Sequence, residues 1–127
     1  MKQKVIAIAG PTASGKTKMA IDLAKEINGE IISADSRLVY KGFDIASAKP
    51  TLDERDGILH YMIDIVEPEY DYSVGDYYEG AKIAINQIVS RGKIPIVAGG
   101  TGLYFRILLE NYDLPRVEAN IKLREES

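Results

Sequence analysis

One segment constrains the fold of this chain more than any other feature: Gly10-Pro11-Thr12-Ala13-Ser14-Gly15-Lys16-Thr17. It satisfies the pattern G-x-x-x-x-G-K-[ST], which binds phosphate when it joins a strand to a helix. An apolar run at residues 5–9 precedes it, and Lys16–Ile27 follows with apolar residues at spacings of three and four. Glycines allow consecutive backbone N–H groups to converge on phosphate oxygens at the positive end of the helix dipole. We therefore expect a phosphate-binding loop between a buried strand and a helix.

Two side chains at the end of this segment suggest specific roles. Lys16 can reach the outer phosphate as a point charge, and the Thr17 hydroxyl is placed to ligate Mg²⁺. The alternative is an ordinary glycine-containing turn between a strand and a helix. A dinucleotide-binding fingerprint is excluded, because G-x-G-x-x-G does not occur at this turn.

The rest of the chain alternates between apolar runs typical of strands and periodic segments typical of helices. Such alternation implies right-handed crossovers and a mainly parallel sheet covered on both faces. Together with the phosphate-binding loop, it predicts an α/β, P-loop NTPase-like three-layer fold. The expected strands are residues 5–9, 30–34, 60–66 and 94–98, and the expected helices are Lys16–Ile27, 73–91 and 103–109. Residues 36–57 are expected to form loops with one or two short helical turns.

The helix expected at residues 73–91 has recognisable ends. Ser73 and Asp76 form a capping-box-like start. Arg91-Gly92 supplies a C-terminal stop, as Asn28-Gly29 does for the first helix. The spacing of the apolar residues between these ends predicts an amphipathic helix. Its apolar stripe consists of Val74, Tyr77, Ala81, Ile85, Ile88 and Val89.

Length and composition suit one ordinary globular domain, with 127 residues, 46% hydrophobic and 28% charged. We expect residues 1–115 to form a P-loop catalytic core, and the highly charged residues 116–127 to begin a truncated helical C-terminal or insertion region.

The apolar runs are far shorter than the roughly 20 residues that span a bilayer. The apolar run near the N-terminus stops at Gly10-Pro11, without the longer apolar region and small-residue cleavage site of a signal peptide. We therefore expect a cytoplasmic protein without a membrane segment.

Composition also limits the chemistry. The chain has no cysteine, which excludes a thiol nucleophile, and its single histidine, His60, is interpreted as a packed or hydrogen-bonded residue. Carboxylates, hydroxyls, lysine and backbone amides must then carry any reaction. The net charge of −3 and the pI of about 5.2 count against an autonomous RNA-binding domain. They allow a domain that holds the reacting end of an RNA while another segment contacts its phosphates.

Two further segments follow expected strands and should reach the sheet edge that carries the phosphate-binding loop. Asp35 could orient Mg²⁺ or water in a hydrolase, or take a proton from the acceptor in a transferase; the alternative is a helix or turn cap. Gly99-Gly100-Thr101-Gly102 suggests close backbone approach to a ligand, and the alternative is a tight strand-to-helix turn. A typical ATPase strand would end in an acid rather than in Gly-Gly, which weakens a plain ATPase interpretation.

Five segments of the chain match the pattern of one family in order, over nearly the whole sequence. They are Gly-Pro-Thr-Ala-Ser-Gly-Lys-Thr at 10–17, Ser-Ala-Asp-Ser-Arg-Leu-Val-Tyr at 33–40, Lys-Gly-Phe-Asp-Ile-Ala-Ser-Ala-Lys-Pro at 41–50, His-Tyr-Met-Ile-Asp-Ile at 60–65 and Gly-Gly-Thr-Gly-Leu-Tyr at 99–104. Together they resemble the tRNA dimethylallyltransferase (tRNA isopentenyltransferase) family. The first segment is shared with many kinases, so the specificity of the match lies in Ala-Asp-Ser, in the Asp-Ile…Ala-Lys-Pro stretch and in Gly-Gly-Thr-Gly-Leu-Tyr.

The resemblance implies a prenyltransferase that moves a dimethylallyl group from dimethylallyl diphosphate to N6 of an adenosine beside the tRNA anticodon, releasing pyrophosphate. The loop from Thr12 to Thr17, with Mg²⁺ as cofactor, would neutralise the charge that develops on the departing pyrophosphate. The adenine must leave the anticodon-loop stack to be reached, as with other base-modifying enzymes. The implied partners are therefore dimethylallyl diphosphate and the tRNA anticodon loop.

The resemblance also implies roles for single residues. Asp35 corresponds to the acid that hydrogen-bonds the adenine amine, so that it can act as general base. Thr101 would position the acceptor and the diphosphate. The implied tRNA contacts are Asp35, Ser36, Arg37, Leu38, Thr101 and Lys122, with Arg124 as an alternative register for Lys122.

The chain also departs from the family pattern. Tyr61 replaces a histidine, and Ala46-Ser47 stands where Gly-Thr is usual, which affects the local pocket geometry. Family members continue into helices and an insertion that grip tRNA, so we expect a fragment that binds diphosphate and modifies tRNA poorly alone. Two other functions stay open: a P-loop small-molecule kinase or ATPase, although no Arg-rich lid is found, and a pyrophosphate-binding module without activity.

Overall fold

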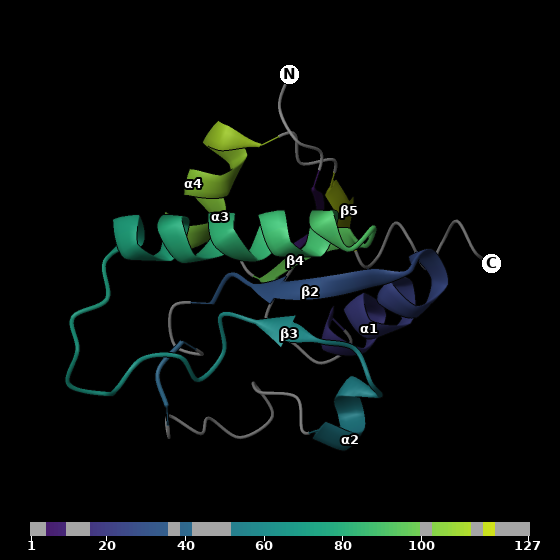
Figure 1. Cartoon of the computed structure of the whole chain (residues 1–127), viewed down its shortest axis with the longest axis horizontal. Coiled ribbons are helices and arrows are strands. Elements are labelled where there is room, and N and C mark those ends of the chain that lie inside the picture. Colours follow the sequence, from purple (N-terminus) through teal and green to yellow (C-terminus); the bar gives the residue numbers. More distant parts are fainter. Residues whose placement is uncertain are drawn as a thin grey trace.

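The computed structural model describes residues 5–9, 16–35, 39–41, 52–99, 103–112 and 116–118. Their centre is a five-stranded sheet with the order β3-β2-β4-β1-β5 (Figure 1). Each pair of neighbouring strands is parallel, which confirms the predicted α/β sheet. The strands are β1 (Ile6–Ala9), β2 (Gly29–Ser33), β3 (His60–Tyr61), β4 (Ile94–Gly99) and β5 (Arg116–Glu118).

Helices cover both faces of this sheet, which confirms the predicted three layers (Figure 1). One face carries α1, and the other carries α3 and α4. The short α2 supplies one of the helical turns expected within residues 36–57, of which 36–38 and 42–51 lie outside the described residues. The helices are α1 (Lys16–Ile27), α2 (Leu52–Arg55), α3 (Val74–Ser90) and α4 (Leu103–Asn111).

Side-chain alternation along the strands divides the hydrophobic core into two parts, because consecutive strand residues point to opposite faces. On the α1 face, Ile8, Ile31 and Ile96 from three adjacent strands pack with buried α1 residues. The next residue of β2, Ile32, and the next residue of β4, Val97, belong to the other cluster, which includes α3 and α4. Each face of the central strands is therefore covered, as their continuous apolar sequences require.

The predicted ends of α3 are confirmed. Ser73 Oγ accepts a hydrogen bond from the Asp76 N–H at 3.0 Å, and the Asp76 carboxylate accepts one from the Ser73 N–H at 3.1 Å. This reciprocal pair is a capping box. At the other end Gly92 adopts φ +77°, and its N–H donates to the Val89 carbonyl at 2.9 Å. A glycine is suited to this left-handed turn because it has no Cβ.

The predicted apolar stripe of α3 is correct at five of its six positions and incomplete. Val74 is half-buried and packs against the core, whereas Val89 is 37% exposed. Ala84, which the stripe omitted, is buried. The buried residues of this helix are Tyr77, Ala81, Ala84, Ile85 and Ile88.

The junction between α1 and β2 differs in detail from the prediction. Asn28, rather than Gly29, takes the left-handed conformation that ends the helix, with φ 62°. Gly29 begins β2, where a Cβ atom would lie 2.8 Å from the Ile94 carbonyl oxygen. The glycine is therefore needed for the close approach of β2 and β4. As a result, β2 starts one residue earlier than the predicted residues 30–34.

The strand predicted at residues 60–66 is wrong beyond its first two residues. Met62 and Asp64 have φ angles of 69° and 58°. These left-handed conformations are incompatible with an extended strand. The chain therefore turns after β3, and Val66 forms an isolated parallel bridge with Tyr40.

Arg116–Glu118 were expected to begin a helical region, and they form β5 instead, parallel to β1. The helical expectation is wrong for these residues because their backbone extends the sheet at its β1 edge. Residues 119–127 lie outside the described part of the chain. The division into a core at 1–115 and a further region at 116–127 stays a prediction.

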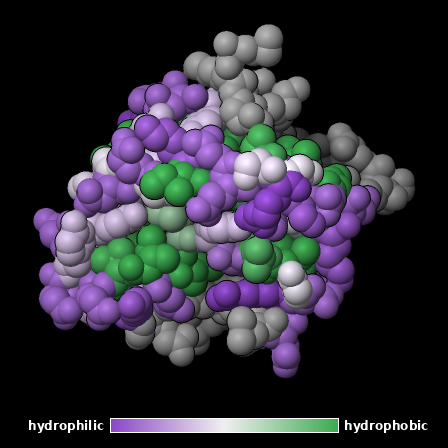
Figure 2. Space-filling model, in the orientation of Figure 1, coloured by the Kyte–Doolittle hydropathy of each residue, from purple (hydrophilic) through white to green (hydrophobic). Residues whose placement is uncertain are grey.

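The surface seen in Figure 2 is mainly hydrophilic, with separate apolar areas. Among the described helices, each is too short or too polar to cross a membrane. Large apolar side chains that are more than half exposed are Leu59, Tyr70, Ile83 and Leu103.

A buried carboxylate connects three elements at the start of β2. Glu30 is 5% exposed. It accepts hydrogen bonds from Arg91, at the end of α3, at 2.7 Å and from the Tyr61 hydroxyl of β3 at 2.8 Å. Arg91 also donates to the Tyr61 hydroxyl. These partners compensate the carboxylate for the hydration that it loses on burial.

Removing the cation of this cluster should destabilise the fold. Arg91→Ala is expected to lower the free energy of unfolding by more than the loss of an exposed ion pair does, because the buried Glu30 carboxylate loses its charged partner. The matched control is Lys41→Ala, which breaks a pair with Glu67 whose side chains are 52% and 61% exposed. That change should be below about 0.5 kcal/mol. Urea denaturation measures both, and equal losses would contradict the role assigned to Glu30.

Candidate active site

The carboxyl ends of β1, β2 and β4 lie together at one edge of the sheet. In the strand register Ala9 pairs with Gly99, and Ser33 pairs with Ala98. The predicted phosphate-binding loop, Asp35 and the glycine-rich segment therefore all begin at this edge. In open parallel sheets ligands bind beyond the carboxyl ends of the strands. The edge is the candidate active site.

The structure describes only part of the predicted site. Lys16 and Thr17 are the first two residues of α1, so this helix begins where the phosphate-binding motif requires. Asp35 is described with its surroundings. The other predicted residues lie outside the described residues, and their roles stay predictions: Gly10, Pro11, Thr12, Ala13, Ser14, Gly15, Ser36, Arg37, Leu38, Thr101 and Lys122.

Asp35 is half-buried, two residues past the end of β2. Its N–H donates to Ser33 Oγ at 3.3 Å. The N–H of Ala34 donates to the Ala98 carbonyl at 3.0 Å, which continues the pairing of β2 with β4 beyond the last strand residue. Hydrogen bonds therefore hold the backbone that carries the Asp35 carboxylate.

The residue before Asp35 also explains one of the predicted glycines. A Cβ atom on Gly99 would lie 2.9 Å from Ala34 Cβ and 3.2 Å from the Ala34 carbonyl carbon and oxygen. Glycine is therefore required for β4 to approach the end of β2. This packing reason is separate from the approach of a ligand, which was the interpretation made from the sequence.

Two aromatic rings support the same turn from the α3 face of the sheet. The Tyr77 hydroxyl of α3 donates to the Ser33 carbonyl at 2.7 Å. Tyr104, in the first turn of α4, stacks on Tyr77 with ring centroids 4.0 Å apart and planes 13° apart. From the sequence, Tyr77 was predicted as a member of the apolar stripe of α3. The polar hydroxyl within an otherwise aliphatic stripe was the one signal of this contact.

Tyr104, in the first turn of α4, has a raised pKa. Burial raises the pKa of Tyr104 to about 12, and the nearby groups Tyr40, Tyr72, Asp76 and Asp35 add to the increase. Burial also raises the pKa of Tyr77 far above its usual range. Both hydroxyls therefore stay protonated at neutral pH, and Tyr77 stays a hydrogen-bond donor.

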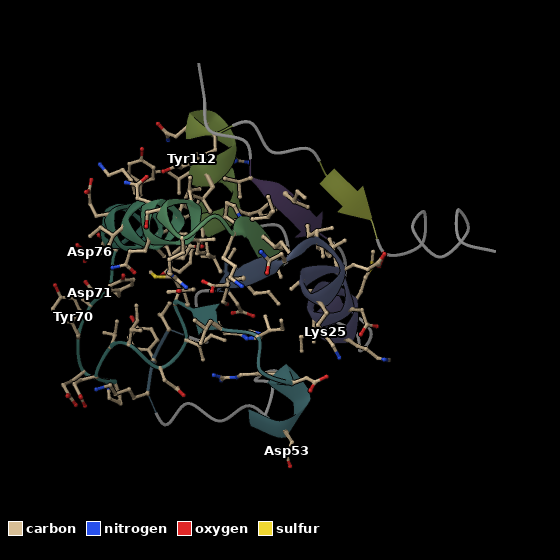
Figure 3. All side chains as sticks on the ribbon, turned by 45° about the vertical axis from the view of Figure 1, so that its right-hand side comes forward. Lys25, Asp53, Tyr70, Asp71, Asp76 and Tyr112 are labelled. Carbon is tan, nitrogen blue, oxygen red and sulfur yellow. The ribbon has the colours of Figure 1, made fainter. Side chains whose placement is uncertain are left out.

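Other polar groups lie around the start of α3 or farther away. Tyr70, Asp71 and Asp76 lie along one outer side of the molecule, whereas Lys25 and Asp53 lie near α1 and α2 (Figure 3).

His60 Nδ1 is 3.0 Å from the Ile58 carbonyl oxygen, and burial lowers the pKa of His60. This contact agrees with the packed, hydrogen-bonded role expected for His60. Within the described ranges, no three His, Cys, Asp or Glu side chains form a group that could hold a metal ion.

Comparisons with known proteins identify the family. The Isopentenyl transferase family model matches residues 3–69, and the IPP transferase family model matches residues 38–127. The chain belongs to the IPP transferase family. The resemblance inferred from the five sequence segments is thereby confirmed.

Individual relatives agree with this family assignment. The tRNA dimethylallyltransferase of Bacillus mycoides is 50% identical over 125 residues, which are 98% of this chain and 39% of that relative. The structure of a tRNA isopentenylpyrophosphate transferase from Bacillus halodurans matches 88% of this chain and 37% of that one, with 47% identity and a TM-score of 0.81. A eukaryotic dimethylallyltransferase acting on tRNA matches 84% of this chain and 26% of that one, with 43% identity and a TM-score of 0.78.

These likenesses confirm the P-loop NTPase-like fold of this IPP transferase family member, because structural agreement and sequence identity are both high. The chain spans 39% of the length of its Bacillus mycoides relative. What the longer relatives act on is therefore a starting point for a proposal about this chain.

A methyl group at Gly99 should disturb the candidate site. Gly99→Ala is expected to lower the free energy of unfolding by about 1–3 kcal/mol, because Ala34 cannot move away without breaking its bond to β4. The control is Gly75→Ala, because a Cβ there would meet only Ser73 Oγ at 3.7 Å. It should be neutral or stabilise by up to about 1 kcal/mol, because alanine is the better helix former. Similar losses in urea denaturation would argue against the close approach.

Proposed function

We propose that this chain is the diphosphate-binding and catalytic part of a tRNA dimethylallyltransferase. The reaction would transfer a dimethylallyl group from dimethylallyl diphosphate to N6 of an adenosine next to the anticodon and release pyrophosphate. The observation that carries the proposal is the meeting of the ends of β1, β2 and β4 at one edge, in a chain of the IPP transferase family. Relatives named tRNA dimethylallyltransferase support the choice of substrates.

The phosphate-binding loop is proposed to hold the diphosphate. Residues 10–15 connect the end of β1 to α1, whose 12 residues are enough for a helix dipole to develop. The loop from Gly10 to Gly15, which includes Pro11, would surround the phosphate oxygens. The backbone N–H groups would come from Gly10, Thr12, Ala13, Ser14 and Gly15. Lys16 would add a positive charge. These groups would interact more strongly with the pyrophosphate as negative charge accumulates on it in the transition state. They would therefore lower the barrier to transfer.

Mg²⁺ is the proposed cofactor. It usually binds through one or two protein oxygens, substrate phosphates and water. Thr17 fits this donor set, because it is the second residue of α1 and carries an oxygen donor at the helix start where the phosphates would lie. When bound, the ion would neutralise part of the diphosphate charge.

Asp35 is proposed as the general base. The adenine amine nitrogen attacks C1 of the dimethylallyl group, the C1–O bond to the diphosphate breaks, and the amine proton passes to the Asp35 carboxylate. The half-buried position of Asp35 and the hydrogen-bonded backbone around it suit a group that must meet a substrate atom in a fixed geometry. Thr101, which follows β4 toward the same edge, is proposed to position the acceptor.

The tRNA contacts are proposed from the resemblance and the chain order. Ser36, Arg37 and Leu38 directly follow Asp35, so a base held at Asp35 would bring the anticodon loop onto this segment. Lys122 would add a basic contact. The cytoplasm is the proposed location because tRNA is the proposed substrate.

Ligand preference tests the diphosphate site. In the presence of Mg²⁺, calorimetric titration of the chain should show tighter binding of dimethylallyl diphosphate than of ATP. Lys16→Ala should weaken the binding of dimethylallyl diphosphate about tenfold or more, because it removes a charged hydrogen bond to phosphate. Lys18→Ala is the matched control, because this exposed lysine pairs with Asp22 on the same helix. A clear preference for ATP would favour a kinase or ATPase and contradict the proposal.

The role of Asp35 predicts a loss of rate without a loss of diphosphate binding. Asp35→Asn should slow transfer to an anticodon stem-loop about 10²- to 10⁴-fold, because an amide cannot take the proton. Its affinity for dimethylallyl diphosphate should change less than about twofold in the calorimetric titration. Asp22→Asn, on the exposed side of α1, serves as the control. A transfer rate unaffected by Asp35→Asn would show that another group is the base.

A further inference from the structure

We propose that the Tyr77 hydroxyl is the positioning group for Asp35, and that the stack of Tyr77 on Tyr104 ties this position to the start of α4. The inference rests on the proposed function, because it takes Asp35 as the base. It concerns a residue on a different element, which reaches Asp35 through the backbone of β2.

The end of β2 needs support on the side where β3 stops. The Ile31 N–H donates to the Leu59 carbonyl at 3.0 Å, so every second residue of β2, including Ser33, directs its backbone groups toward that side. The last pair of β2 with β3 joins Ile32 to Tyr61, and the chain then turns away. The regular ladder on this side therefore ends before Ser33.

The Tyr77 hydroxyl bonds the Ser33 carbonyl at this point, at 2.7 Å. Tyr77 is fully buried, with 0% of its surface exposed, and Ser33 is 5% exposed. A hydrogen bond in such surroundings is stronger than one in water, and leaving its acceptor without a partner is costly. The bond therefore fixes the carbonyl of Ser33 more firmly than a surface contact could.

Ser33 transmits this constraint to Asp35. Its Oγ accepts a hydrogen bond from the Asp35 N–H at 3.3 Å, and the intervening Ala34 is held on the other side by the Ala98 carbonyl at 3.0 Å. The backbone from Ser33 to Asp35 is thus fixed from the α3 side and from β4. A base must meet its substrate proton within hydrogen-bond distance, so small displacements of this backbone reduce the rate.

The stacked ring of Tyr104 extends the constraint to the other side of the site. Tyr104 lies in the first turn of α4, immediately after the segment that carries Thr101, and its ring is 4.0 Å from that of Tyr77. The end of β2 and the start of α4 are therefore both in contact with one pair of rings. The relative position of Asp35 and the start of α4 depends on Tyr77.

The test compares Tyr77→Phe with Tyr78→Phe. Tyr78 is the next residue of α3 and is half-buried, with Lys82 Nζ 5.4 Å from its ring centre. Its substitution also removes one tyrosine hydroxyl from α3, which makes it a matched control. In transfer to an anticodon stem-loop, Tyr77→Phe should lower kcat about tenfold and leave both KM values within about twofold. Tyr78→Phe should leave kcat and KM unchanged.

A double variant separates positioning from general stability. If Tyr77 acts through Asp35, then Tyr77→Phe should cause no further loss of kcat in an Asp35→Asn background. Losses that multiply in the double variant would overturn the proposal. An unchanged kcat in Tyr77→Phe, with only a lower unfolding midpoint, would also overturn it.

A second measurement does not depend on activity. Amide hydrogen exchange at Asp35, followed by NMR, should become about tenfold faster in Tyr77→Phe than in Tyr78→Phe, while amides in α1 exchange at similar rates in both variants. Because this comparison needs no transfer, it tests the positioning even when the chain alone modifies tRNA poorly, whereas failure of the proposed function shows separately as a preference for ATP over dimethylallyl diphosphate. Equal exchange at Asp35 in the two variants would overturn the positioning itself.

Discussion

The parallel register of β1, β2 and β4 is the constraint on which the rest of this structure depends. Parallel pairing requires each strand to be followed by a crossover, and it places the three carboxyl ends at one edge. The phosphate-binding loop, the half-buried carboxylate of Asp35 and the glycine-rich segment all leave the sheet there. Residues separated by some ninety positions can thus act on one substrate, because the sheet and not the local sequence brings them together.

Local sequence patterns predicted which strands end at this edge, but they did not predict the contacts that support the end of β2. The phosphate-binding motif, the carboxylate after β2 and the glycines after β4 are local patterns, and each follows an apolar run that predicts a strand. The hydrogen bond from Tyr77 to Ser33 joins residues 44 positions apart, so local patterns contain no record of it. The one available signal was a tyrosine hydroxyl within an apolar stripe, which must find a partner when it is buried.

The differences between the predicted and the observed helices and strands also arise from contacts between residues that are far apart in the sequence. Capping residues and helical periodicity predicted the ends of α3, because the contacts involved lie within a few residues of one another. The length of β3 was not predictable, since an apolar run does not reveal that Met62 and Asp64 adopt left-handed conformations. The same limit applies to Arg116–Glu118, whose charged sequence gives no sign of pairing with β1. Long-range packing decided both outcomes.

Two polar contacts fix α3 along β2, and this explains how a surface helix can influence the candidate base. Arg91, at the end of α3, binds Glu30 at the start of β2, and Tyr77, near the start of α3, binds Ser33 at the end of β2. The helix therefore runs antiparallel to the strand and is attached at both ends (Figure 1). Apolar packing between them is non-directional and would tolerate small displacements along the strand. The two hydrogen bonds are directional, so they set the axial position of α3 and, through Ser33, that of Asp35.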